Sequence, residues 1–98
     1  MNDLELQLSF SRYALKFLQK NRHLYTQTQV EEWVIEAILS LINQEVCALD
    51  LGELYANWAG HYRIRRGKTR IIFNYTHEDG TLLVEIQVVK IGFRKDVY

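Results

Sequence analysis

Basic residues concentrate in two short segments of the last third of the chain. The first, His61 to Arg70, reads His-Tyr-Arg-Ile-Arg-Arg-Gly-Lys-Thr-Arg and contains no acid, and the second, Gly92 to Tyr98, reads Gly-Phe-Arg-Lys-Asp-Val-Tyr. Guanidinium groups bind phosphate oxygens in pairs, so arginines clustered on a sheet are suited to hold phosphate. Nucleic acid is the cellular phosphate that such a surface favours, and we expect it as a partner.

Cleavage of RNA without a metal requires a base for the 2′-hydroxyl, cations for the phosphorane and an acid for the leaving 5′-oxygen. Arginine supplies the charge but is a poor base, because it hardly deprotonates in proteins. His61 has the same strand parity as Arg63 and Arg65, which makes it a candidate base. Each residue also has a plainer interpretation: strand arginines and histidines are often solvated surface, and Tyr98 is by default a frayed chain end.

Other chemistries find little support in the residue spacing. His23, His61 and His77 lie far apart, and no Cys/His pair has the spacing of metal ligands. Neither a glycine-rich phosphate loop nor a nucleophile elbow is present. Cys47 is the single cysteine, which excludes an internal disulfide, and the helical pattern around it predicts a buried thiol. We therefore expect no metal and no cofactor.

The charge of the chain is unevenly distributed although the formal net charge is zero. Residues 1–52 contain four Lys/Arg and seven Asp/Glu, whereas residues 53–98 contain eight Lys/Arg and five Asp/Glu. The halves therefore carry charges of −3 and +3, and the local potential at a binding face matters more than the sum. The hydrophobic fraction of 48% and the length of 98 residues indicate a single globular domain, residues 1–98.

The beginning of the chain lacks the basic-then-apolar order of a signal peptide. No apolar run approaches the length needed to cross a bilayer. The sequence therefore predicts a soluble, cytoplasmic protein without a membrane partner.

The first half predicts one strand and two helices. Residues 4–10 alternate apolar and polar side chains, which is typical of a half-buried strand. Ser11 is positioned to cap a short amphipathic helix that ends near Lys20 and Asn21.

The second helix shows the clearest periodicity in the chain. Thr28 and Glu31 match the Thr-x-x-Glu capping box. An apolar stripe runs from Val30 to Ile42 for more than three turns. We expect this helix to end between Cys47 and Gly52.

The second half predicts three strands. Residues 61–65 alternate, Gly67 supplies a turn, and residues 70–76 are rich in β-branched and aromatic side chains. Residues 78–80, Glu-Asp-Gly, predict a second turn. The most hydrophobic strand, residues 82–91, is predicted to be central and covered on both faces.

The resulting order is β-α-α-β-β-β, an α+β fold. Two helices are expected to cover one face of a small, mainly antiparallel sheet, leaving the arginine face open.

The segments Gly60–Phe73 and Val89–Tyr98 resemble the RelE/ParE superfamily of bacterial toxins, whose members share this size and element order. The motif resemblance covers roughly residues 54–98, and the first half agrees only in layout. It implies a toxin of a type II toxin–antitoxin system. RelE-type members cut messenger RNA in the ribosomal A site without a metal and so inhibit translation.

The resemblance also implies roles for individual residues. Arg70 matches the arginine that stabilises the transition state, Arg94 the acid or leaving-group stabiliser, and Tyr98 the C-terminal tyrosine that orients or deprotonates the 2′-hydroxyl. Two departures bear on the base: Arg63 and Arg65 stand where RelE has lysines, and Phe93 stands where many relatives have histidine. The residues expected to bind RNA are His61, Arg63, Arg65, Arg66, Lys68 and Lys95.

Two other functions fit the same resemblance. One is a ParE-type, non-enzymatic inhibitor of DNA gyrase, and the other is a degenerate member that only binds RNA or an antitoxin. Arg94 and Tyr98 favour the nuclease. The expected partners are a cognate antitoxin, in a possible hetero-oligomer, and messenger RNA on the ribosome. The antitoxin is expected to cover the arginine face, with Tyr55 and Trp58 as docking points.

Overall fold

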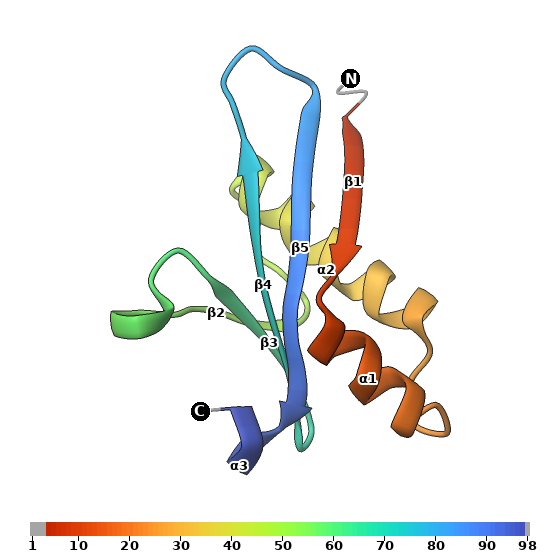
Figure 1. The fold of residues 1–98 in the computed structure, drawn as a ribbon. Coiled ribbons are helices and arrows are strands. Elements are labelled where there is room, and N and C mark those ends of the chain that lie inside the picture. Colours follow the sequence, from red (N-terminus) through yellow and green to blue (C-terminus); the bar gives the residue numbers. More distant parts are fainter. Residues whose placement is uncertain (1–3, 98) are drawn as a thin grey trace.

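A computed structural model describes residues 4–97 of the chain. Its helices and strands are β1 (Glu5–Phe10), α1 (Arg12–Lys20), α2 (Gln27–Asn43), β2 (Asp50–Glu53), the 3-10 turn η1 (Ala56–Trp58), β3 (Tyr62–Arg66), β4 (Thr69–His77), β5 (Leu83–Phe93) and α3 (Arg94–Val97). The strands form one sheet in the order β1-β5-β4-β3-β2, in which only β1 and β5 pair in parallel. Helices α1 and α2 lie on one side of this sheet (Figure 1). The predicted α+β arrangement is confirmed.

Helix α1 begins and ends where the sequence predicts. The Ser11 hydroxyl accepts a hydrogen bond from the Ala14 N–H at 3.1 Å and donates to the Val89 carbonyl of β5. At the other end, the Asn21 side chain donates to the Phe17 carbonyl at 2.9 Å. Both caps satisfy backbone groups that a helix end leaves unpaired.

The predicted bounds of α2 are wrong at both ends. The capping box is formed by Thr26 and Gln29, not by Thr28 and Glu31, and each of the two side chains accepts a hydrogen bond from the backbone N–H of the other residue. At the C-terminus, Gln44 adopts a left-handed conformation with φ 54°, which ends the helix three residues before Cys47. The prediction that a helix buries Cys47 is therefore also wrong, and its side chain is partly exposed.

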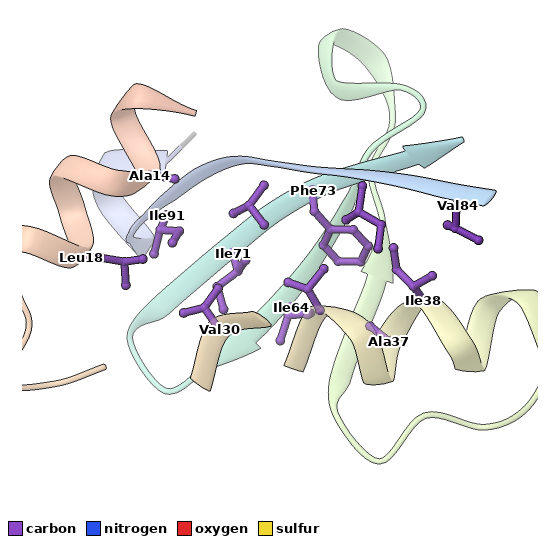
Figure 2. Packing of buried hydrophobic residues seen from close by; sticks show 13 residues of the cluster. Ala14, Leu18, Val30, Ala37, Ile38, Ile64, Ile71, Phe73, Val84 and Ile91 are labelled. Atoms are coloured by element: carbon purple, nitrogen blue, oxygen red, sulfur yellow. The ribbon is translucent and has the colours of Figure 1, made fainter. Parts of the chain in front are cut away.

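The core lies between the sheet and the two helices (Figure 2). Phe73, Ile64 and Ile71 project from β3 and β4 toward α2, and all three are fully or almost fully buried. Val30, Val34, Ala37 and Ile38 of α2 and Ala14 and Leu18 of α1 complete this cluster. Each buried Val, Leu, Ile or Phe side chain contributes about 1.5–3 kcal/mol relative to exposure. This face of the sheet is therefore the rigid support for the opposite one, which we call the open face.

Strand β2 was not predicted. It is a four-residue edge strand that pairs antiparallel with β3 and places Asp50 opposite Arg65. The segment Asp-Leu-Gly-Glu lacks β-branched and aromatic residues, so its composition gives little strand signal.

Strand β5 lies between β1 and β4, and β4 is the middle strand of the sheet. The prediction that β5 is covered on both faces is wrong over its first half, because Glu85 and Gln87 are exposed there. A bulge follows, in which the register changes between the pairs Ile72–Lys90 and Phe73–Val88. The helices of residues 4–97 include none that is long and apolar enough for a membrane span.

Candidate phosphate-binding site

Four residues form a row across the open face near the turn between β3 and β4. Cα pairing sets Asp50 of β2 opposite Arg65 of β3, Arg65 opposite Arg70 of β4, and Arg70 opposite Gly92 of β5. Directly opposed residues of antiparallel strands project from the same face, with Cβ atoms about 4.5–5.5 Å apart. Two arginines and one carboxylate are thus held side by side on a rigid sheet.

Arg70 is the buried member of this row, with 6% of its surface exposed. Its Nη1 donates to the carbonyl oxygen of Gly67 in the β3–β4 turn at 2.7 Å and to that of Thr69, the first residue of β4, at 3.2 Å. Among the side chains that the structure describes, no carboxylate pairs with it. A buried charge without a counterion is unfavourable, so an anion bound beside Arg70 would gain from an arginine already desolvated and oriented.

Asp50 restrains two of the three arginines of β3, Arg63 and Arg65. Its carboxylate accepts a hydrogen bond from Nε of Arg65 at 2.5 Å and lies 3.9 Å from Nη1 of Arg63. The Arg63 guanidinium lies over Gly52, where a Cβ atom would come within 2.3 Å of Nη2. The absence of a side chain at Gly52 therefore leaves the space that Arg63 occupies.

Arg94 reaches the same end of the sheet from the last strand. Its backbone N–H donates to the Lys68 carbonyl at 2.9 Å, which ties the start of α3 to the β3–β4 turn. Lys68, Phe93, Arg94 and Lys95 line an open hollow of about 590 Å³. The single helical turn α3 was not predicted, and it lies at the end of β5 beside the β3–β4 turn (Figure 1). The cations Lys68, Arg94 and Lys95 thus line the hollow together with the apolar ring of Phe93.

His61 does not join this cluster. Its Nε2 lies 3.1 Å from Nδ2 of Asn74 in β4. Its Nδ1 lies 3.4 Å from the carbonyl oxygen of Ala59. An Nδ1–H tautomer satisfies both contacts. His61 precedes Arg65 by four residues of extended chain, or about 13 Å.

Arg66 lies on the helix-covered side of the sheet. Its guanidinium is 4.5 Å from the ring centroid of Trp33 in α2, a cation–π contact. Arg66 therefore projects to the side of the sheet opposite to Arg63 and Arg65, although it lines a hollow at the β3–β4 turn together with Arg65 and Lys68, and its expected contact with RNA stays a prediction. Adjacent residues of a strand project to opposite sides, and Arg66 follows Arg65 directly.

Tyr98 lies outside the described residues. Of the other residues selected from the sequence, Arg65, Lys68, Arg70, Arg94 and Lys95 meet at the β3–β4 turn, and Arg63 adjoins them on the open face. Asp50 was missed because its pairing with β3 is not visible in local sequence. Within residues 4–97, no group of three His, Cys, Asp or Glu side chains is arranged to hold a metal ion.

Comparison with known proteins places this arrangement in a known fold. No protein-family model matches the sequence, and no curated protein matches it. Solved structures do match along nearly the whole chain. A copper-bound mutant toxin from Helicobacter pylori superposes with a TM-score of 0.63 at 15% identity, over 96% of this chain and 100% of that one. The chain has the RelE-like fold.

Two complexes with partner proteins are also similar to this RelE-like chain. The match to a chain of the DinJ–YafQ complex of Escherichia coli has a TM-score of 0.59 at 13% identity, over 96% of this chain and 99% of that one. The match to the YoeB–YefM complex of Staphylococcus aureus has a TM-score of 0.52 at 20% identity, over 92% and 98%. At these identities the likeness concerns the fold.

Proposed function

We propose that this protein is the toxin of a type II toxin–antitoxin system and that it cleaves messenger RNA in the ribosomal A site. The observation that carries the proposal is Arg70, a buried arginine that donates to two backbone carbonyls and lies opposite Arg65. Arg94 lies close by, because its backbone N–H donates to the carbonyl of Lys68 in the adjoining β3–β4 turn. Fixed cations aimed at a phosphate stabilise the charge that develops in a transition state, and such groups are worth about 10²–10³ in rate. The RelE-like fold of the chain supports the same function.

In this reaction the 2′-hydroxyl attacks the adjacent phosphorus, and the bond to the 5′-oxygen breaks. Arg70 stabilises the charge of the phosphorane, and Arg94 stabilises or protonates the leaving oxygen. Tyr98 is the group proposed to orient or deprotonate the 2′-hydroxyl, and His61 is too distant along β3 for that role. The step needs no metal, because the guanidinium groups carry the counter-charge.

The described cluster contains no strong base near Arg70. Attack on the phosphorus therefore depends on a message held in a reactive geometry, which the ribosome supplies. Free RNA is accordingly a poor substrate. We therefore propose that the protein acts in the cytoplasm, where ribosomes translate.

A cognate antitoxin is the proposed protein partner, as in the DinJ–YafQ and YoeB–YefM complexes. We propose that it covers the open face and blocks access to Arg65 and Arg70. The proposed docking points are Tyr55 and Trp58. Tyr55 is 74% exposed, and the Trp58 ring packs edge-on against His61 with ring centroids 5.3 Å apart. A purified toxin–antitoxin pair that cleaves as fast as the toxin alone would contradict this arrangement.

The test is primer-extension mapping of a reporter message in a purified translation system. Wild-type protein is compared with Arg94→Ala and with the control His77→Gln, which changes a polar side chain at the far end of β4 from the hollow. We expect cuts in register with codons that require ribosomes and disappear only with Arg94→Ala. An intact message, together with continued arrest of cell growth, would redirect the search to DNA gyrase.

A further inference from the structure

Helix α1 carries a basic face that the nuclease site does not use. Arg12, Lys16 and Lys20 recur every four residues and are all exposed, so they form a stripe of about 12 Å along one side of the helix. Arg22 and His23 follow in the exposed turn. We call Arg12, Lys16 and Lys20 the α1 basic face.

No acid is close to this face in sequence. Residues 6–30 contain four Lys/Arg and one His but no Asp or Glu. Among the described side chains, the carboxylate salt bridges involve Arg63 and Arg65 and none of the cations of α1. The net charge of −3 over residues 1–52 thus conceals a segment, residues 6–30, whose charged side chains are all cations.

The charges of the chain are also segregated along the sheet. Glu78 and Asp79 occupy the β4–β5 turn, and Glu85 lies near it, at the end opposite to Lys68 in the β3–β4 turn. Figure 1 shows α1, the β3–β4 turn and α3 at the same end of the molecule. The β4–β5 turn is therefore acidic, whereas the end with the β3–β4 turn carries most of the cations named above, with Asp50 among them.

Helix α1 adjoins the candidate site. Phe17 of α1 meets Phe93 edge-on with ring centroids 5.2 Å apart, and Phe93 lines the hollow with Lys68, Arg94 and Lys95. A polyanion long enough to extend beyond the hollow meets α1 next.

The opposite side of α1 is already occupied. Ala14 and Leu18 are buried in the core, and helix α1 has nine residues. Tyr13 and Leu15 are the large apolar side chains of α1 that stay exposed, and two such side chains are much less apolar surface than a membrane-surface helix presents. Binding through α1 must therefore be electrostatic contact with a polyanion.

We propose that the α1 basic face binds the phosphate backbone of structured RNA, independently of sequence, and so anchors the protein beside the message that it cuts. The choice of RNA over other polyanions rests on the proposed function. The contact itself rests on the charge of α1 and its position.

The test is the binding of a fluorescent 20-base-pair RNA duplex, measured by anisotropy between 50 and 200 mM salt. The variant Arg12→Gln/Lys16→Gln/Lys20→Gln removes the face, and Arg12→Lys/Lys16→Arg/Lys20→Arg preserves its charge as a matched control. We expect the neutral variant to lose about tenfold or more in affinity and the slope of log K against log salt to fall by about 2–3, while the control binds as wild type. All three positions are exposed, and thermal unfolding checks that each variant remains folded.

Equal binding by the neutral variant and wild type, or no binding by wild type, would overturn the proposal. So would α1-dependent binding to phosphatidylserine vesicles without binding to the duplex. Arg70→Ala separates the two proposals, because it should slow cleavage by about 100-fold or more, whereas the loss of duplex affinity on neutralising α1 should be the same with and without Arg70→Ala. If the wild-type protein binds the duplex through α1 but never cleaves, the proposed function fails and this inference stands.

Discussion

Asp50 and Arg65 face each other across the β2–β3 pair, and the carboxylate accepts a hydrogen bond from Nε of the guanidinium. The same carboxylate lies 3.9 Å from Arg63. The open face therefore contains an internal anion that occupies the position where a phosphate would bind the two arginines. Bound RNA has to compete with Asp50 for them.

Asp50→Asn is expected to strengthen the binding of single-stranded RNA. Removal of the carboxylate frees Arg63 and Arg65 for phosphate, so the slope of log K against log salt should steepen by about 1. Stability should change by less than about 1 kcal/mol, because the Asp50 and Arg65 side chains are 43% and 50% exposed. Anisotropy titrations and urea unfolding measure the two quantities. Weaker RNA binding by the variant would show that Asp50 orients the arginines more than it competes.

Gly52→Ala is expected to act through Arg63. The new Cβ would come within 2.3 Å of Nη2, so the guanidinium must move, while the flexible end of the side chain keeps the effect on stability small. RNA affinity should fall to the level of Arg63→Ala, and the double variant should be no weaker than either single one. Additive losses in this double-mutant cycle would mean that the two positions act independently.

Arg66→Ala is expected to affect stability more than RNA binding. Its guanidinium lies over Trp33 on the helix-covered side, and a cation–π contact of this kind contributes about 0.5–1 kcal/mol. Urea unfolding should show a loss of that size, with RNA affinity within about threefold of wild type. A larger loss of RNA affinity than Arg65→Ala causes would place Arg66 at the RNA after all.

The stability of the protein is expected to fall at high pH through Tyr62. Burial raises the pKa of Tyr62 above its usual value, and the neighbouring Tyr75 and Glu53 raise it further. The folded state then holds a proton that the unfolded state has released, so the contribution is complete below about pH 10 and is lost as the pH rises through the folded pKa. Between pH 8 and 11, the free energy of unfolding should fall less steeply with pH for Tyr62→Phe than for the wild-type protein. Identical profiles would exclude this cause.

Local patterns predicted much of the fold. The alternation of residues 4–10, the Ser11 cap and the Gly67 turn depend on neighbouring residues, and the structure confirms all three. The start of α2 was misplaced by two residues because Thr26 with Gln29 and Thr28 with Glu31 both match a capping box, and only the backbone path selects one.

The site was predicted less completely, because its geometry depends on pairing between strands. Arg65 and Arg70 were correctly assigned to one hairpin, but the register that sets Asp50 against Arg65 joins residues from separate strands without a local motif. The parity of β3 already separated Arg66 from Arg65, and grouping them by charge ignored it. The end of α2 at Gln44 depended on a left-handed residue that is not glycine, for which composition gives little signal.

The central claim is that Arg70 stabilises the transition state of RNA cleavage. The most direct measurement is the single-turnover rate of cleavage of a ribosome-bound message by wild type, Arg70→Ala, Arg70→Lys and Arg66→Ala, with thermal unfolding of each variant. We expect both Arg70 variants to be slower by about 100-fold or more while remaining folded, and Arg66→Ala to stay within about threefold of wild type. A folded Arg70→Ala variant that cleaves as fast as Arg66→Ala would contradict the claim.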